Sequence, residues 1–206
     1  MLATSGRPSG SLAGWTAEYK ADGFRCQATV IAGRRVLRTR GGQDIADRVP
    51  ELEPLSRLGV DVVLDGELVS GAGRPSDFYD VIGAVSARRR NRPRLNFLAF
   101  DVLWLDGSWL VDHPHADRRR LLERLHELSD TALSVVSSFA ATDVGDLLAG
   151  CEDLDLEGVV LKRSASRYRP GRSRDWRKVK TGAWRNVHLP ARQQTRQPAG
   201  RHPRTP

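Results

Sequence analysis

Apolar and polar residues alternate in the first part of the chain, over residues 15–20, 25–31 and 35–40. This alternation is typical of strands with one buried face. Turn signals at Asp22-Gly23 and at Gly33 separate the three segments. Short strands joined by such turns predict an antiparallel meander. Further apolar stretches predict additional strands over residues 60–69, 95–105, 133–139, 157–162 and 176–180.

Apolar residues at helical spacing predict helices over residues 45–58, 77–86, 118–128 and 142–151. Pro50 and Pro54 limit the length of the first. Thr142 is a candidate N-cap for the last. Residues 1–14, rich in Gly, Ser and Pro, predict an irregular lead-in.

Length and composition are typical of one domain with a full core, since the 206 residues are 39% hydrophobic. We expect this domain to cover residues 1–180, and residues 181–206 to form a basic, disordered tail. No segment is apolar enough for a signal peptide or a membrane span, so we expect a cytoplasmic monomer without a membrane partner. Cys26 and Cys151 show no metal spacing and predict buried, reduced thiols.

The net charge of +8 favours a polyanionic partner, although a basic surface that only keeps the protein in solution is the alternative. The arginine-rich segment 88–94 fits either a phosphate contact or a solvated turn.

Lysine is rare in this basic chain and occurs only at Lys20, Lys162, Lys178 and Lys180. A lysine amine can act as a nucleophile once it has lost its proton, whereas arginine stays protonated. Lys20 ends a predicted strand, and strand alternation places it on the same face as Glu18. Lys20 is therefore our candidate for covalent catalysis.

The other lysines differ in what their spacing predicts. Lys178 and Lys180 are two residues apart on a predicted strand, which suits a paired phosphate clamp or a charged edge strand. The odd spacing of Glu157 and Lys162 places them on opposite faces of a regular strand, unless Gly158 permits a bulge. Lys162 is for this reason the weaker site candidate.

The run Lys20-Ala21-Asp22-Gly23-Phe24-Arg25 resembles the nucleophile motif of covalent nucleotidyltransferases: ATP-dependent DNA ligases, RNA ligases and capping enzymes. Such a turn is also an ordinary hairpin corner. Five further segments resemble DNA-ligase motifs, in the family's order, at 38–42, 64–68, 97–107, 157–162 and 176–180. The segments at 97–107 and 157–162 are most similar to DNA ligases of the small bacterial type.

The resemblance implies an α+β nucleotidyltransferase fold, with two mainly antiparallel sheets flanked by helices and the nucleotide between them. It implies ATP and Mg²⁺ (or Mn²⁺) as cofactors and nicked double-stranded DNA as partner. Lys20 would attack the α-phosphate of ATP, carry AMP as a phosphoramidate, and pass it to a DNA 5′-phosphate in repair or recombination.

The resemblance also implies roles for single residues. Glu18 would accept a hydrogen bond from the adenine amino group, Phe100 would stack on adenine, and Arg40 would contact ribose and the DNA end. Glu67 and Glu157 would hold the metal ion. The residues implied to bind the nucleotide are Glu18, Arg25, Arg40, Glu67, Phe100, Arg172, Lys178 and Lys180.

Nothing after Lys180 resembles the oligonucleotide-binding (OB) barrel that follows the core in this family. We therefore expect an adenylylation domain alone, with nick sealing impaired. Two alternatives stay open: a catalytically silent nucleic-acid-binding remnant, and an RNA ligase or capping-type transferase.

Overall fold

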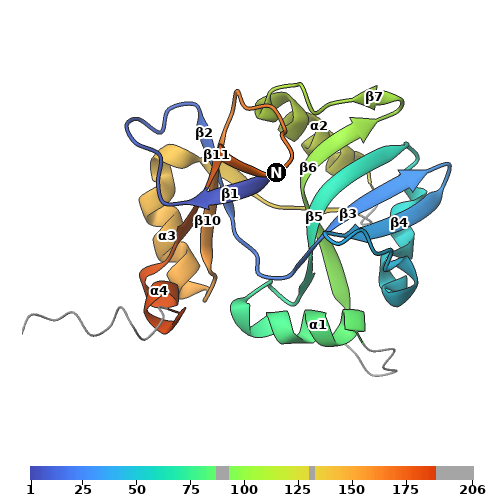
Figure 1. Ribbon diagram of the computed structural model, residues 1–206, viewed down its shortest axis with the longest axis horizontal. Coiled ribbons are helices and arrows are strands. Elements are labelled where there is room, and N and C mark those ends of the chain that lie inside the picture. Colours follow the sequence, from blue (N-terminus) through green and yellow to red (C-terminus); the bar gives the residue numbers. More distant parts are fainter. Residues whose placement is uncertain (87–92, 130–132, 189–206) are drawn as a thin grey trace, which may run out of the picture.

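Two β-sheets stand side by side in the computed structural model, which describes residues 1–86, 93–129 and 133–188 (Figure 1). The first sheet contains, in order across it, β1 (Leu2–Ser5), β11 (Arg172–Lys180), β10 (Gly158–Arg163), β2 (Trp15–Tyr19) and β9 (Ser138–Ala140). The second contains β4 (Arg34–Thr39), β3 (Phe24–Ile31), β5 (Val62–Ser70), β6 (Leu95–Leu105) and β7 (Ser108–Trp109), with β8 (Ser134–Val135) beside β6.

Neighbouring strands are antiparallel except in the pairs β1–β11 and β6–β8. Helices flank both sheets (Figure 1). The α-helices are α1 (Phe78–Ser86), α2 (His115–Leu128), α3 (Val144–Asp153) and α4 (Gly182–His188). The 3₁₀-helices are η1 (Ala46–Arg48), η2 (Pro50–Arg57), η3 (Pro75–Asp77) and η4 (Ala141–Asp143). The predicted α+β architecture of two mainly antiparallel sheets is thus confirmed.

Each sheet has its own apolar core. The larger cluster packs the second sheet against α1, α2 and η2, and includes Leu55, Val81, Phe97 and Leu122. The smaller cluster packs β2 and β10 against α3 through residues such as Leu161 and Cys151. Because each sheet buries one face in this way, polar side chains on the other faces are available to line the space between the sheets.

Residues 45–58 do not form the predicted α-helix but the two 3₁₀-helices η1 and η2. Pro50 lies at the start of η2 and Pro54 lies inside it. Proline lacks an N–H and its ring clashes with the preceding turn, so a continuous α-helix is excluded here. The apolar spacing still buries Leu52 and Leu55.

Three further expectations are corrected. The lead-in is not wholly irregular, because β1 pairs with β11 from the far end of the chain. Thr142 is not the N-cap of α3: it lies within η4 and its hydroxyl donates to Asp143. The tail is not irregular from Thr181, because α4 starts at Gly182 and the Thr181 hydroxyl accepts from the Trp184 N–H at 3.1 Å.

Residues 189–206 and most of the arginine-rich segment 88–94 lie outside the described residues. In the described ranges, no helix has both the length and the apolar character needed to cross a bilayer.

Candidate active site

A pocket of about 330 Å³ opens between the two sheets. It contains side chains from both. From the first sheet and the turn after β2 come Glu18, Lys20, Val160, Lys162, Arg172, Trp176 and Lys178. From the second sheet and the residue after β4 come Arg25, Arg40, Glu67, Leu98 and Phe100. Eight of the sequence-predicted site residues therefore line one cavity: Glu18, Lys20, Arg25, Arg40, Glu67, Phe100, Arg172 and Lys178.

Lys20 directly follows β2, and its backbone N–H donates to the Gly158 carbonyl at 2.8 Å. The turn that follows requires glycine at position 23, because a Cβ there would lie 2.1 Å from the Leu68 carbonyl oxygen. The turn thus packs against the end of β5 and fixes where Lys20 enters the pocket. The Lys20 amine forms an ion pair with Glu157.

Glu157 joins two lysines, since its other carboxylate oxygen lies 2.7 Å from the Lys180 amine. Burial alone would raise the pKa of Glu157, but Lys20 and Lys180 hold it below its ordinary value. Lys180 also lies 3.0 Å from the centre of the Trp184 ring in α4. Glu157, predicted as a metal ligand, is therefore placed next to the candidate nucleophile.

Lys178 lines the pocket from β11. Burial and the neighbouring Lys180 lower its pKa. Arg40 and Arg172 also line the pocket, and neither forms an ion pair within the described part of the chain. These three cations, Lys178 and Arg172 from the first sheet and Arg40 from the second, give the cavity a positive charge that suits phosphate.

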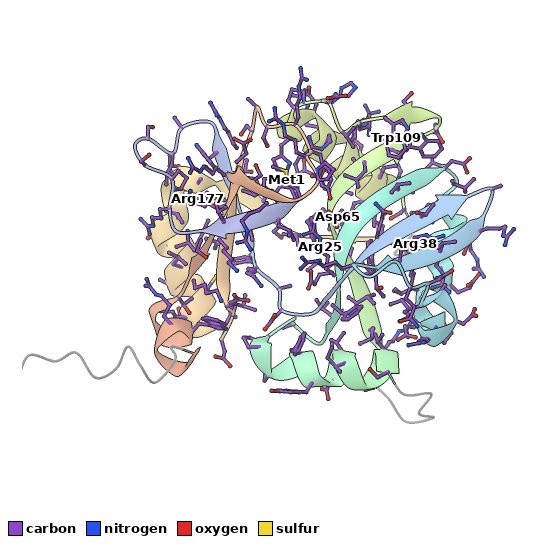
Figure 2. All side chains as sticks on the ribbon, viewed as in Figure 1. Met1, Arg25, Arg38, Asp65, Trp109 and Arg177 are labelled. Atoms are coloured by element: carbon purple, nitrogen blue, oxygen red, sulfur yellow. The ribbon has the colours of Figure 1, made fainter. Side chains whose placement is uncertain are left out.

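Arg25 points toward Asp65, as Figure 2 shows, and donates two hydrogen bonds to its carboxylate at 3.0 and 2.6 Å. The Tyr168 hydroxyl donates to the same carboxylate at 2.7 Å. The buried charge of Asp65 is thereby compensated, and less of the Arg25 charge remains for a ligand.

Glu67 is different from Asp65, because it forms no ion pair with any residue in the described ranges. Burial raises its pKa to about 7, and Lys20 and Arg25 oppose this rise. A cation in the pocket would favour the ionised form of this carboxyl.

Lys162 also lines the pocket, although its odd spacing from Glu157 predicted the opposite face of a regular strand. Glu157 precedes β10, and Gly158 at φ +146° separates it from the regular alternation of the strand. Lys162 is only 1% exposed, and its amine lies 2.6 Å from Glu18 and 2.8 Å from the Phe100 carbonyl oxygen. The Phe100 ring packs edge-on against Trp176.

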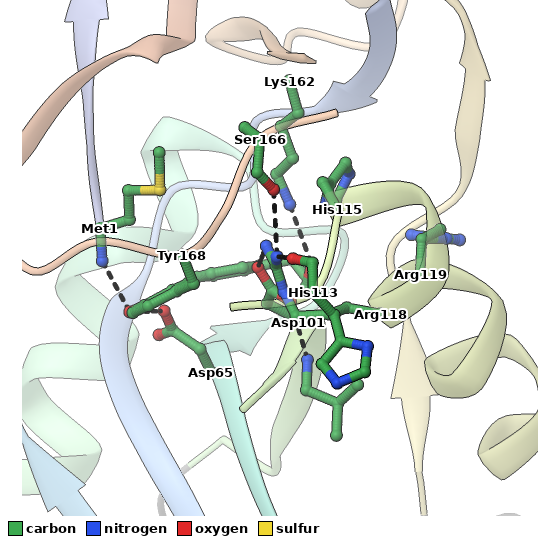
Figure 3. A network of polar contacts seen from close by, with 12 residues as sticks. Met1, Asp65, Asp101, His113, His115, Arg118, Arg119, Lys162, Ser166 and Tyr168 are labelled. Carbon is green, nitrogen blue, oxygen red and sulfur yellow. Dashed lines mark hydrogen bonds and ion pairs between the residues drawn. The ribbon is translucent and has the colours of Figure 1, made fainter. Parts of the chain in front are cut away.

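A second buried ion pair lies behind the pocket and was not predicted from the sequence. Arg118 of α2 donates two hydrogen bonds of 2.8 Å to Asp101, and both side chains are fully buried (Figure 3). Arg118 also donates to the carbonyl oxygens of His113 and Ser166. Arg118 lies in the first turn of α2, and no local pattern in the sequence distinguishes it from the exposed Arg120.

Among the described residues, no group of three or more His, Cys, Asp or Glu side chains is arranged to hold a metal ion. A cation bound by Glu67 or Glu157 would therefore need further ligands from a nucleotide or water, as Mg²⁺ commonly has.

Two sheets with a lysine-bearing pocket between them define the nucleotidyltransferase class of α+β proteins. Within this class, the chain belongs to the ATP dependent DNA ligase domain family, whose model matches residues 9–180.

Similar proteins include the multifunctional non-homologous end joining protein LigD of Pseudomonas aeruginosa, 39% identical over 170 residues. That match covers 81% of this chain and 20% of the relative. The LigD protein of Mycobacterium tuberculosis H37Rv is 37% identical, over 90% of this chain and 25% of the relative. The chain thus spans a fifth to a quarter of the length of these relatives.

Solved structures give the same grouping. The ligase domain of M. tuberculosis LigD superposes with a TM-score of 0.73 at 36% identity, covering 87% of this chain and 59% of that one. A mycobacterial DNA ligase D complexed with ATP and MES gives a TM-score of 0.72 at 34% identity, with 87% and 58% coverage.

Proposed function

We propose that residues 1–180 are the adenylylation domain of an ATP-dependent DNA ligase, acting as a monomer on nicked double-stranded DNA. The observation that carries this proposal is the Lys20 amine, placed in a two-sheet pocket beside Glu157 and Lys180. The relatives named for non-homologous end joining support a role in repairing DNA breaks.

The proposed reaction has two transfers. The Lys20 ammonium, which is paired with Glu157, first releases a proton to water. The neutral amine then attacks the α-phosphorus of ATP, an N–P bond forms, the P–O bond to pyrophosphate breaks, and the nitrogen loses a second proton. An oxygen of a DNA 5′-phosphate then attacks the same phosphorus, and the N–P bond breaks with return of a proton to lysine. Lys178 and Arg172 stabilise the negative charge on the transferring phosphate.

Glu67 and Glu157 would hold a divalent cation jointly with the nucleotide. Glu67 lines the pocket, and Glu157 pairs with the Lys20 amine beside it. The Glu67 carboxyl suits a cation best, because it lines the pocket and forms no ion pair with any described residue. Bound Mg²⁺ (or Mn²⁺) would neutralise and polarise phosphate oxygens.

The test is covalent labelling. The purified 206-residue chain is incubated with α-labelled ATP and Mg²⁺, denatured, and examined for protein-bound label. We expect acid-labile, alkali-stable label in the wild type and none in Lys20→Ala. Arg163→Gln is the matched control, because its side chain is 60% exposed. An unlabelled wild type that still binds DNA would instead support the silent remnant, and preferential GTP labelling a capping-type enzyme.

A further inference from the structure

We propose that Lys162 is a positioning residue for base selection: it holds the Glu18 carboxylate in the pocket as a hydrogen-bond acceptor, so that adenine is bound in preference to guanine. This inference rests on the proposed nucleotide-binding function of the same pocket.

The contacts of Lys162 are all internal. Its amine joins the Glu18 carboxylate at 2.6 Å to the Phe100 carbonyl oxygen at 2.8 Å. It also lies 4.9 Å from the centre of the Phe100 ring and 4.3 Å from that of Trp176. An ammonium has three N–H donors and no acceptor. With two donors bound to oxygen and the group covered by two rings, Lys162 orients Glu18 and Phe100 rather than serving as a free phosphate ligand.

The position and ionised form of the Glu18 carboxylate depend on Lys162 more than on its other neighbours. The groups that face it are Lys162 from β10, Arg119 and His115 from α2, and Asp101 from β6. Arg119 is 3.5 Å away and also binds Glu123 at 2.6 Å, so its charge is shared. His115 lies 3.8 Å away, and burial lowers its pKa to about 2, so the imidazole is neutral. Lys162 is therefore the nearest cation to this carboxylate.

Removing that cation changes the hydrogen-bonding character of Glu18. Burial raises the pKa of Glu18, while Lys162 and Arg119 act against this rise. Without Lys162 the carboxyl would take up a proton more readily. A carboxylate only accepts hydrogen bonds, whereas a protonated carboxyl also donates.

The protonation state of Glu18 therefore decides whether the pocket discriminates between adenine and guanine. Adenine carries an amino donor at its 6-position, whereas guanine carries a carbonyl acceptor there. A carboxylate at the pocket wall accepts from the adenine amino group and repels the guanine oxygen. A protonated carboxyl would accommodate both bases.

The experiment measures the affinities for ATP and GTP by calorimetry without metal, so that binding is read separately from chemistry. The proteins are the wild-type chain, Lys162→Met, Lys162→Arg and, as matched control on the same strand, the exposed Arg163→Gln. We expect the ATP:GTP preference to fall by about tenfold to a hundredfold in Lys162→Met. In Lys162→Met, the ATP:GTP preference should return in part above neutral pH, because Glu18 then ionises. The preference should be largely kept in Lys162→Arg and unchanged in Arg163→Gln.

If Lys162 had a purely structural role, Lys162→Met would weaken the binding of ATP and GTP equally. That result, or an unchanged ratio of the two affinities, overturns the proposal. If Lys162→Met does not fold, Glu18→Gln supplies the same measurement, because its amide can donate to guanine; an unchanged ratio there also overturns it. A wild type that binds neither nucleotide overturns this inference together with the proposed function. If the wild type binds ATP selectively but Lys20 takes up no label, the inference about Lys162 is supported. Only the proposed covalent chemistry is then contradicted.

Discussion

Arg118 and Arg120 lie two residues apart on α2 and should differ sharply in their effect on stability. Arg118 is fully buried and binds Asp101 through two hydrogen bonds, whereas Arg120 forms an exposed pair with Asp117. Removing one partner of a buried pair leaves an uncompensated charge. We expect Arg118→Met to lower the free energy of unfolding by about 3–5 kcal/mol, as measured by urea denaturation.

Arg120→Met is the matched control, for which the loss should stay under about 1 kcal/mol. Equal losses in the two variants would show that burial of the Arg118–Asp101 pair adds nothing to stability.

The raised pKa of Glu67 predicts that its contribution to folding stability depends on pH. Burial raises the pKa of its carboxyl from 4.5 to about 7, so ionising it costs folding free energy as the pH rises between these values. Glu67→Gln should match the wild type near pH 4 and exceed its stability at pH 8 by about 1–3 kcal/mol. Urea unfolding at both pH values, without nucleotide or metal, measures this.

The control for Glu67 is Glu127→Gln on the exposed side of α2, which should change stability by less than about 0.5 kcal/mol at either pH. A Glu67→Gln stability curve parallel to that of the wild type would contradict the raised pKa of the Glu67 carboxyl.

At the residue scale, eight of the ten side chains named from the motifs line the pocket, whereas Glu157 and Lys180 pair beside Lys20 without lining it. How the side chains pair was not predicted. Lys20, Glu67 and Phe100 are far apart in sequence and line one cavity, as the resemblance implies. The pairing of Lys162 with Glu18 depends on the register of β10 against β2, which no local pattern contains. Trp176 lines the pocket although it was not predicted as a site residue, because an aromatic residue on a strand is as typical of a core.

At the scale of elements, Gly158 connects Glu157 to β10. Its φ is +146°, and a Cβ there would lie 2.2 Å from the Val179 carbonyl oxygen. Gly158→Ala should therefore separate β10 from β11 and lower the free energy of unfolding by about 3 kcal/mol. Denaturant unfolding gives this value.

Gly83→Ala is the matched control. Gly83 is exposed in α1, and a Cβ added there would meet no neighbouring atom within 4 Å, so alanine should stabilise the helix by up to about 1 kcal/mol. A destabilisation shared by both variants would point to a general intolerance of the fold and not to the β10–β11 contact.

The elements themselves were predictable where one local rule dominates. Alternation of the sequence located β2, β3 and β4, and in β3 every second residue from Cys26 to Val30 is buried. Residues 45–58 form 3₁₀-helices where their apolar spacing predicts an α-helix, because Pro54 excludes a continuous α-helix. Strand β1 was missed because its stability comes from pairing with β11, about 170 residues later.

At the scale of the whole molecule, the pocket is built by two sheets that have separate apolar cores. A nucleotide bound between them would contact both, for example Glu18 and Lys178 on one side and Glu67 and Phe100 on the other. Binding to the folded state alone should therefore stabilise both sheets together, by about 2.7 kcal/mol at a ligand concentration 100-fold above Kd.

We expect ATP to raise the thermal midpoint by about 5–10 °C under those conditions, as differential scanning calorimetry can measure. Hydrogen exchange should slow in β10 of the first sheet and in β5 of the second to a similar extent, because both lose the same unfolding fluctuation. Val160→Trp, which fills the cavity from β10, is the control and should abolish the shift. Protection confined to one sheet would mean that ATP binds outside the pocket, since only a ligand touching both walls couples the two cores.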